Sequence, residues 1–167
     1  MRMSSALVGP LWGRRVVAGV GFGAAVAAVA VVGSVAAASS SGRYEALELP
    51  SWAPPAPLFG PVWTVLYALI AFAGWRLWDS AGSLRPVRRE LALYAAGLVL
   101  NGVWTPLFFA LGAPVAALVD IVVLDLVVAA QVVAFARRDR TAGLVLVPYL
   151  MWTVFATALN AAIVALN

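Results

Sequence analysis

Hydrophobic residues fill five long stretches of this chain, and short polar segments separate them. Each stretch is about 20 residues or longer, the length of α-helix that crosses the roughly 30 Å hydrocarbon core of a bilayer at about 1.5 Å per residue. The pattern therefore predicts an all-α integral membrane protein, a five-transmembrane-helix bundle in a single domain. We expect spans at residues 16–38, 58–78, 91–111, 115–136 and 142–166.

Residues 1–15 are basic and are expected to form a cytoplasmic N-terminal segment ahead of the membrane domain, 16–167. A cleaved signal peptide is the alternative for this end of the chain, because an Ala/Ser-rich sequence follows the first span. The hydrophobic region of a signal peptide is only about 7–15 residues long. The uncharged run from Val16 to Ala38 is longer, which favours a retained helix.

The segment 39–57 between the first two spans is rich in proline. Pro50 and the Pro54–Pro55 pair favour extended or turn backbone and exclude helix there. Because this stiff loop leads directly into a helix that carries Trp63, we expect it to form a lid over a ligand pocket.

Composition supports a membrane location and excludes several kinds of chemistry. The chain is 64% hydrophobic and 11% charged, whereas a soluble domain is about 45–50% apolar and 25% charged. It contains no Cys and no His. It therefore lacks a thiol nucleophile, the commonest metal ligand and the usual general base. We expect no metal site and no covalently bound cofactor.

All of the eleven basic residues except Arg43 fall in segments on one side of the predicted membrane. They lie in the N-terminal segment, around the loop 79–90 and in 137–140. Cytoplasmic loops carry an excess of basic residues, so this distribution predicts a cytoplasmic N-terminus, with the proline-rich loop and the C-terminus on the opposite side of a bacterial cell membrane. The positive net charge is thereby explained without a nucleic-acid partner.

Five residues with a carboxyl or amide side chain fall within the predicted spans: Asn101, Asp120, Asp125, Gln131 and Asn160. A charged Asp at the centre of an isolated spanning helix costs about 2.5–3.5 kcal/mol. Two interpretations stay open for the acids. One is a proton or ligand site, and the other is interhelical hydrogen bonding by a neutral carboxyl.

Three helical stripes contain aromatic residues, and two of them add small or polar ones. Tryptophans of membrane proteins usually lie at the interface, which suits Trp12, Trp75 and Trp78. Trp63 and Trp152 lie inside spans, where they would line a pocket or pack in the core. The stripes are Trp63 and Tyr67; Asn101, Trp104 and Phe108; and Tyr149, Trp152, Ala156 and Leu159.

Small residues in the third span allow close helix contact. Ala92, Ala96 and Gly97 could support a homodimer or tight packing within one molecule, and the sequence leaves both open. Pro106 and Pro148 are expected to kink the third and fifth spans, which would open space in the bundle.

Four segments resemble signatures of the tryptophan-rich sensory protein (TspO/MBR) family, which includes the translocator protein, or peripheral benzodiazepine receptor. They are LELPSWAPPAPLFGPVWTVLY (47–67), LVLNGVWTPLFF (98–109), ALVDIVVL (117–124) and PYLMWTVFATALN (148–160). The resemblance implies a five-helix bundle with a pocket under the first loop. It also implies a porphyrin ligand, and eukaryotic relatives bind cholesterol and benzodiazepine-type drugs.

Within these motifs, six residues match family pocket positions: Trp63, Asn101, Trp104, Trp152, Ala156 and Leu159. We add Tyr44 and Asp120 as candidate ligand-binding residues. The resemblance implies a tetrapyrrole receptor or carrier that regulates tetrapyrrole metabolism or a stress response. An enzyme that degrades porphyrin in light through Trp63 and Trp152, and a scaffold for another membrane protein, are the alternatives.

The chain departs from the family pattern in the first loop and in the C-terminal segment. Arg43-Tyr44 replaces the usual Trp-Tyr, and Leu49 replaces a lysine. A positive group could pair with a porphyrin propionate, so either Arg43 supplies it or the choice of ligand differs. The segment LNAAIVALN (159–167) lacks the Tyr and Arg of the cholesterol-recognition pattern, which lowers the expectation of sterol binding.

Overall fold

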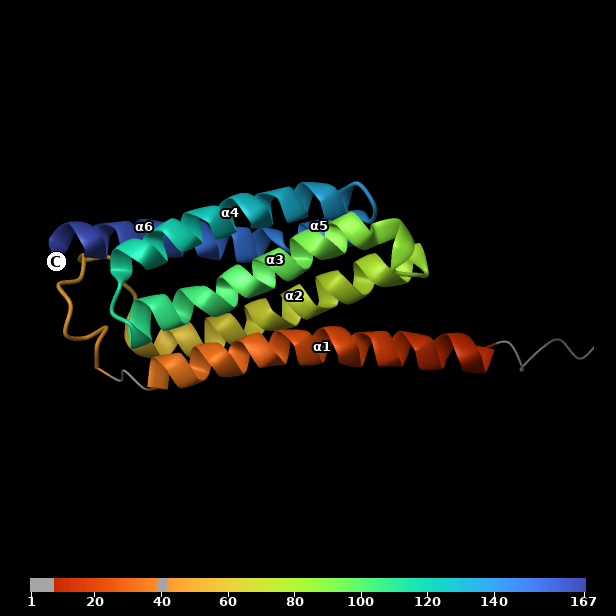
Figure 1. Cartoon of the computed structure of the whole chain (residues 1–167), viewed down its shortest axis with the longest axis horizontal. Helices are drawn as coiled ribbons and strands as arrows, with labels where there is room; N and C mark the ends of the chain where they lie inside the picture. The colour runs from red at the N-terminus through yellow and green to blue at the C-terminus, as the bar shows by residue number, and fades with distance from the viewer. Residues whose placement is uncertain (1–7, 39–41) are drawn as a thin grey trace, which may run out of the picture.

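Long helices connected by short loops make up the computed structural model, which describes residues 8–38 and 42–167 and contains no strand within them (Figure 1). The α-helices are α1 (Val8–Ala38), α2 (Phe59–Ala81), α3 (Arg88–Thr105), α4 (Pro114–Ala136), α5 (Arg140–Leu144) and α6 (Val147–Leu166). Two 3-10 turns, η1 (Ala56–Leu58) and η2 (Arg85–Val87), and a π-helical turn, η3 (Pro106–Ala110), complete the helical elements.

Five helical segments of the described chain are long and apolar enough to cross a membrane. They are formed by α1, by η1 with α2, by η2, α3 and η3 together, by α4, and by α5 with α6. The predicted fold class, an all-α integral membrane bundle of five spans, is confirmed.

The first and fifth spans show the largest differences from the predicted element boundaries. Helix α1 begins at Val8, so residues 8–15 of the predicted N-terminal segment are helical, and residues 1–7 lie outside the described part of the chain. The lid is described from Gly42 onward, which leaves its predicted residues 39–41 outside as well. The fifth span is two helices, because α5 ends at Leu144 and α6 begins at Val147.

The two prolines predicted to kink helices act differently from each other. Pro106 begins the π-helical turn, and the Leu111 amide donates to the Pro106 carbonyl at 2.9 Å. Proline cannot donate within the regular helical ladder, and a wider π turn is one way a helix accommodates such a disruption. Pro148 lies in the first turn of α6, where the missing N–H is not needed. The irregularity expected in the fifth span is therefore present as the break between α5 and α6, directly before Pro148, and not as a bend within α6.

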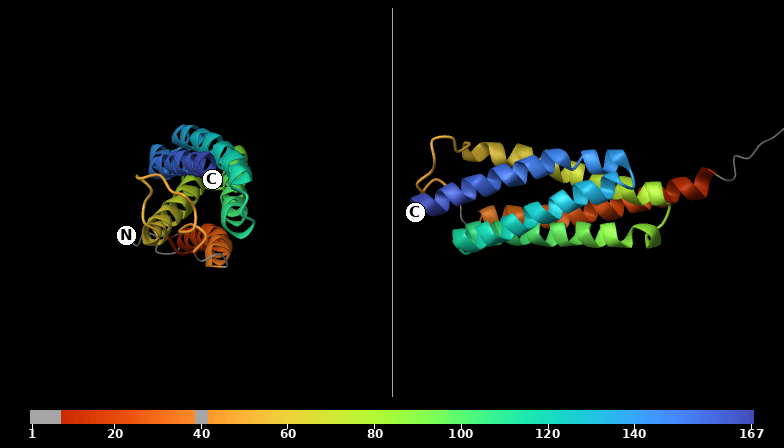
Figure 2. Two further views of the ribbon diagram at one scale, coloured as in Figure 1. Left: turned by 90° about the vertical axis from the view of Figure 1, so that its left-hand side faces the viewer. Right: turned by 90° about the horizontal axis from the view of Figure 1, so that it is seen from above.

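Helix α4 packs along α3 and α6, and α1 packs along α2 and α3 (Figure 2). Large apolar side chains such as Phe135, Leu77 and Leu124 fill the centre and are fully buried. Others, such as Val119 and Leu126, are exposed on the outside of the bundle. An exterior of this kind is suited to lipid tails.

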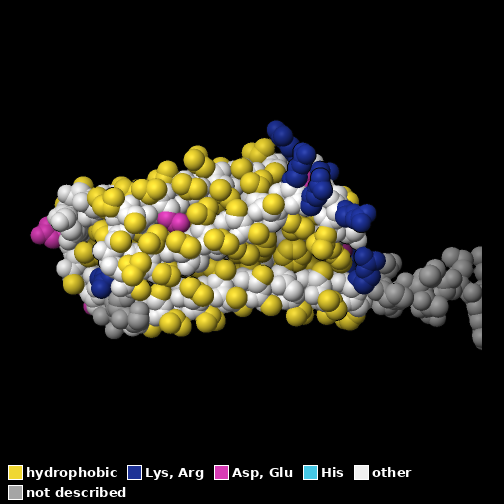
Figure 3. Space-filling view, in the orientation of Figure 1, with side chains coloured by type: hydrophobic (Ala, Val, Ile, Leu, Met, Phe, Trp, Pro, Cys, Tyr) yellow, Lys and Arg dark blue, Asp and Glu magenta, His cyan; other side chains and the backbone are white. Residues whose placement is uncertain are grey.

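Arginines gather at one end of the bundle (Figure 3). Three of them join elements there through ion pairs: Arg15 with Asp79 at 2.7 Å, Arg76 with Asp139 at 2.9 Å and Arg138 with Glu90 at 2.7 Å. Arg43 lies at the opposite end, where it donates to the Ala110 carbonyl. The predicted separation of charge between the two ends is present.

Gly97 does not belong to an outward-facing small-residue surface. It is buried, and the amide of Gln131 on α4 covers it and donates to the Leu93 carbonyl at 2.8 Å. Ala92 and Ala96 are exposed. The grouping of all three on one dimer face is therefore wrong, since Gly97 serves the contact between α3 and α4. A homodimer stays a prediction that rests on the two alanines alone.

Candidate functional site

A cavity of about 590 Å³ lies under the lid, at the end of the bundle opposite the arginines. Its wall comes from α1, α2, the end of α3, η3 and α6, and the lid contributes Tyr44 and Glu45. Most of the lining is aromatic, aliphatic or glycine, and the carboxylate of Glu45 is its one formal charge among the described residues. Such a site suits a mainly apolar ligand with few polar groups.

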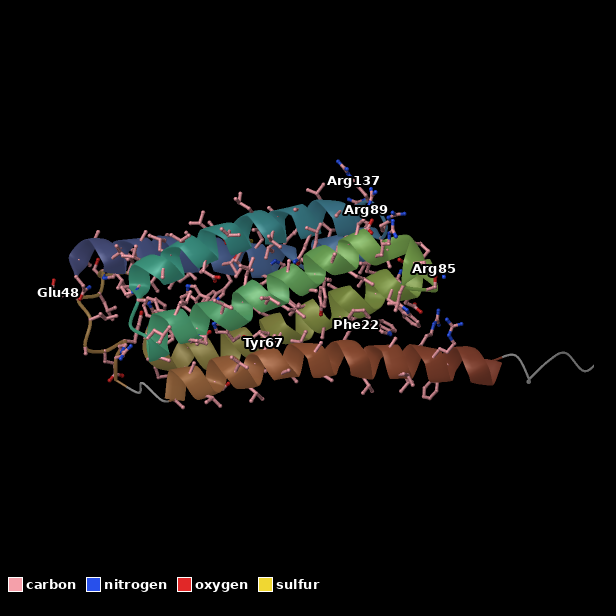
Figure 4. All side chains as sticks on the ribbon, viewed as in Figure 1. Phe22, Glu48, Tyr67, Arg85, Arg89 and Arg137 are labelled. Atoms are coloured by element: carbon pink, nitrogen blue, oxygen red, sulfur yellow. The ribbon has the colours of Figure 1, made fainter. Side chains whose placement is uncertain are left out.

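The α2 wall is formed by Trp63 and Tyr67, which are one helical turn apart with ring centroids 5.3 Å apart. The Tyr67 hydroxyl donates to Asn101 Oδ1 at 3.1 Å, and Asn101 Nδ2 donates to the Tyr149 hydroxyl at 3.0 Å. This chain of hydrogen bonds links α2, α3 and α6 beneath the cavity. It fixes the position of Tyr67, which Figure 4 labels on α2.

The opposite wall depends on the π-helical turn. Trp104 stacks on Phe108 with ring centroids 5.3 Å apart and 20° between the planes, and Phe108 and Phe109 both line the cavity. The Trp104 indole donates to Asn160 Oδ1 at 3.3 Å, and Asn160 Nδ2 donates to the Pro114 carbonyl at 2.9 Å. The indole is therefore held in a defined orientation.

The lid is attached to the bundle at several points. Tyr44 is buried, packs edge-on against Phe59 at 5.4 Å and donates to the Pro54 carbonyl at 3.1 Å. Burial raises the pKa of the Tyr44 phenol, which keeps it a hydrogen-bond donor. Asn167 exchanges two hydrogen bonds with the backbone of Glu48, at 3.0 and 3.1 Å. The lid thus borders the cavity and is joined to the end of α6.

The two departures from the family pattern lie outside the cavity lining. The Arg43 guanidinium donates to the Ala110 carbonyl and lies against Gly112. Leu49 packs in an apolar cluster around Tyr44. Neither side chain presents a positive charge to the cavity, so the arrangement offers no support for Arg43 as a partner for a propionate.

The structure brings five of the eight predicted ligand-binding residues together on the cavity wall and leaves three away from it. Asn101 lies behind Tyr67, and Asp120 lies on α4 with a buried carboxylate oxygen that has no hydrogen-bond partner among the described residues. Trp152 packs against Phe59 and Phe155 at 6.0 and 5.4 Å. The five on the wall are Tyr44, Trp63, Trp104, Ala156 and Leu159.

The remaining acid, Asp125, joins two helices. Thr157 of α6 donates to Asp125 Oδ2 at 2.7 Å, in line with the interhelical interpretation rather than a site at the cavity. Its second oxygen is buried without a partner in the described structure.

Several cavity residues were not predicted as ligand-binding. Two of them have a sequence feature that could have pointed to the cavity: Tyr67 follows Trp63 by one helical turn, and Asn160 is a polar residue within a span. Gly33 and Ser34 of α1 have no such feature. Only the packing of α1 against α2 and η3 brings these small residues to the cavity.

The TspO/MBR family model matches residues 22–166. This chain belongs to the TspO/MBR family. Its similarity extends to the tryptophan-rich protein TspO of Chlorobaculum tepidum, 41% identical over 77% of this chain and 81% of that protein. The tryptophan-rich sensory protein of Cereibacter sphaeroides is 41% identical over 74% of this chain and 76% of the relative. The translocator protein of Sus scrofa is 38% identical over 70% of each chain.

Membership in the TspO/MBR family agrees with the five apolar helices and makes the chain an integral membrane protein with bacterial homologues. All of the residues that line the cavity lie within the matched residues.

Proposed function

We propose that this protein is a membrane receptor or carrier for tetrapyrroles and holds a porphyrin in the cavity under the lid. One observation supports the proposal above others: the indoles of Trp63 and Trp104 both line a single, largely apolar cavity of about 590 Å³. Pockets for small molecules are about 300–1,000 Å³. A porphyrin is a flat apolar macrocycle on which aromatic rings can stack.

Binding is better supported than light-dependent degradation by Trp63 and Trp152. Degradation in the predicted form needs both indoles close to the bound macrocycle. Trp152 is not among the lining residues and packs between Phe59 and Phe155. The amount of bound porphyrin would either act as a signal to tetrapyrrole metabolism or remove precursors from it.

The proposal includes an orientation in a bacterial cell membrane. The arginine-rich end faces the cytoplasm, and the lid and cavity face the opposite side. Basic residues at one end of the bundle support this assignment.

A fluorescence titration of the purified protein with protoporphyrin, in detergent and in the dark, tests the proposal. We expect saturable quenching of the tryptophans. Ala156→Phe should weaken binding by about tenfold or more, because forcing a large side chain into a packed site costs roughly 1–3 kcal/mol. Ala158→Phe is the matched control, since Ala158 is exposed on the same helix.

Absence of saturable quenching, or equal losses in the two variants, would overturn the proposal. Illumination of the same sample in air then tests degradation. A new absorbing product that disappears in both Trp63→Phe and Trp152→Phe would replace the receptor with an enzyme.

A further inference from the structure

A second hollow, of about 840 Å³, opens beside α1 at the arginine-rich end of the bundle. Its walls come from α1, α3, the end of α2 and the loop after it, and it shares no residue with the cavity under the lid. Figure 3 shows hydrophobic side chains next to the arginines on this face. In the part of the chain that the structure describes, Arg14 is the only charged residue on its wall. We call this feature the α1 groove.

Two helical stripes of apolar residues line the α1 groove and extend away from the arginine-rich end of the bundle. On α1, Val17, Gly21 and Ala25 follow Arg14 at intervals of three or four residues. On α3, Leu91 and Leu98 lie on the opposite wall. Residues at such spacing share one face of a helix, so each stripe is apolar along its whole length beyond the mouth.

The mouth of the groove is positively charged. Arg14 donates to the Gly82 carbonyl at 3.3 Å and forms no ion pair with any described residue, whereas its neighbour Arg15 is paired with Asp79. Arg88 precedes Leu91 by one helical turn on the same face of α3, and it too is in no ion pair within residues 8–38 and 42–167. Positive charge at the mouth is therefore available to an anion.

The length of the groove matches one leaflet of a bilayer. Arg14 and Ala25 are eleven residues apart, which is roughly 16 Å along the helix. The hydrocarbon core is about 30 Å thick, so an apolar chain that begins at Arg14 would end near the bilayer midplane.

We propose that the α1 groove binds an anionic phospholipid, with the phosphate on Arg14 and Arg88 and one acyl chain between the stripes of α1 and α3. The charge at the mouth, the apolar walls beyond it and the length of one leaflet together define this occupant. Gly21 provides the room, since a Cβ atom there would meet no other atom within 4 Å.

Native mass spectrometry of the purified full chain with added phosphatidylglycerol or phosphatidylcholine tests the proposal. We expect one phosphatidylglycerol to stay bound, with weaker retention of phosphatidylcholine. Arg14→Gln should lower phosphatidylglycerol affinity by about fivefold, the effect of one basic residue near an anionic lipid. Arg137→Gln, which removes the same charge from the far side of this end, should leave the affinity unchanged.

A second pair of variants separates the groove from the general lipid coat. Gly21→Leu should abolish retention of the bound lipid because the leucine fills the space. Gly23→Leu is the control on the same helix, because Gly23 also has no atom within 4 Å but does not line the groove. Equal retention in both variants, or equal loss, would overturn the proposal. A protein dimer that Gly21→Leu disrupts would assign the groove to a second copy of the chain instead.

Discussion

At the scale of single residues, Asn101 holds the cavity together without lining it. Its amide accepts from Tyr67 and donates to Tyr149, so one side chain connects three helices at the base of the site. A match to a family pocket position did not distinguish this supporting role from direct ligand contact. The hydrogen bonds do.

Replacement of Asn101 by Leu should lower the free energy of unfolding by about 1–3 kcal/mol, since the hydroxyls of Tyr67 and Tyr149 lose their partner in an apolar interior. A lower midpoint in a thermal unfolding scan in detergent would show the loss. Thr64→Ala is the control, because the Thr64 hydroxyl bonds only within its own helix. A variant as stable as the wild type would contradict the supporting role.

Tyr44→Phe removes the hydrogen bond to the Pro54 carbonyl and keeps the ring packed on Phe59. We expect protoporphyrin affinity to fall by about two- to tenfold, the equivalent of one hydrogen bond worth roughly 0.5–1.5 kcal/mol. The dissociation constant from the fluorescence titration measures the change. Tyr44→Ala should weaken binding further, and unchanged affinity in both variants would show that the lid does not contribute to binding.

At the scale of elements, close helix contact depends on positions without side chains. Gly97 allows Gln131 of α4 to lie directly on α3. Gly143 does the same where α5 meets Ala136 at the end of α4. Both glycines serve contacts inside the bundle.

Gly97→Ala should destabilise the protein by about 1–3 kcal/mol, because the new Cβ atom would collide with the buried Gln131 amide. This cost outweighs the helix-propensity gain of about 1 kcal/mol from glycine to alanine. Gly23→Ala, where space is open, should show only the gain. If both variants were more stable than the wild type in thermal scans, the contact between α3 and α4 would have to be looser than described.

Asn167, at the end of α6, links the lid to that helix by hydrogen bonds. Asn167→Ala removes both hydrogen bonds to the Glu48 backbone, so amide hydrogen exchange over residues 42–55 should become faster. Glu48→Ala is the matched control, because these bonds use the backbone of Glu48 and not its side chain. Equal exchange in Asn167→Ala and the wild type would show that the lid is held by its other contacts.

At the scale of the whole molecule, the two ends differ in charge, and each contains one of the two hollows. Figure 4 shows Arg85, Arg89 and Arg137 at the end away from Glu48 on the lid. The cavity under the lid lies at one end and the α1 groove at the arginine end. The two proposed sites would therefore face opposite leaflets.

Single cysteines can test this orientation, because the chain has none of its own. In intact bacterial cells, a membrane-impermeant maleimide should label Glu48→Cys, and it should label Arg137→Cys only after the membrane is permeabilised. Both positions are exposed on the protein, so a difference in labelling reports the side of the membrane and not burial of the residue. The reverse pattern would invert the proposed topology.

The sequence by itself determined the fold class, the number of spans, the segregation of arginines and the placement of the aromatic stripes. These properties follow from local rules, since helix length, hydropathy and helical period depend on residues close together in the chain. The stripes of α2 and α6 accordingly place Trp63, Ala156 and Leu159 on the cavity wall.

Only the tertiary structure decided which members of each stripe face the cavity. Trp152 is one turn from Ala156 and yet packs against Phe59, and Asn101 points toward two tyrosines. The interior position of Gly97 and the contribution of Gly33 depend on how neighbouring helices pack. Helix rotation is set by packing and hydrogen bonds between segments far apart in sequence, which no local pattern records.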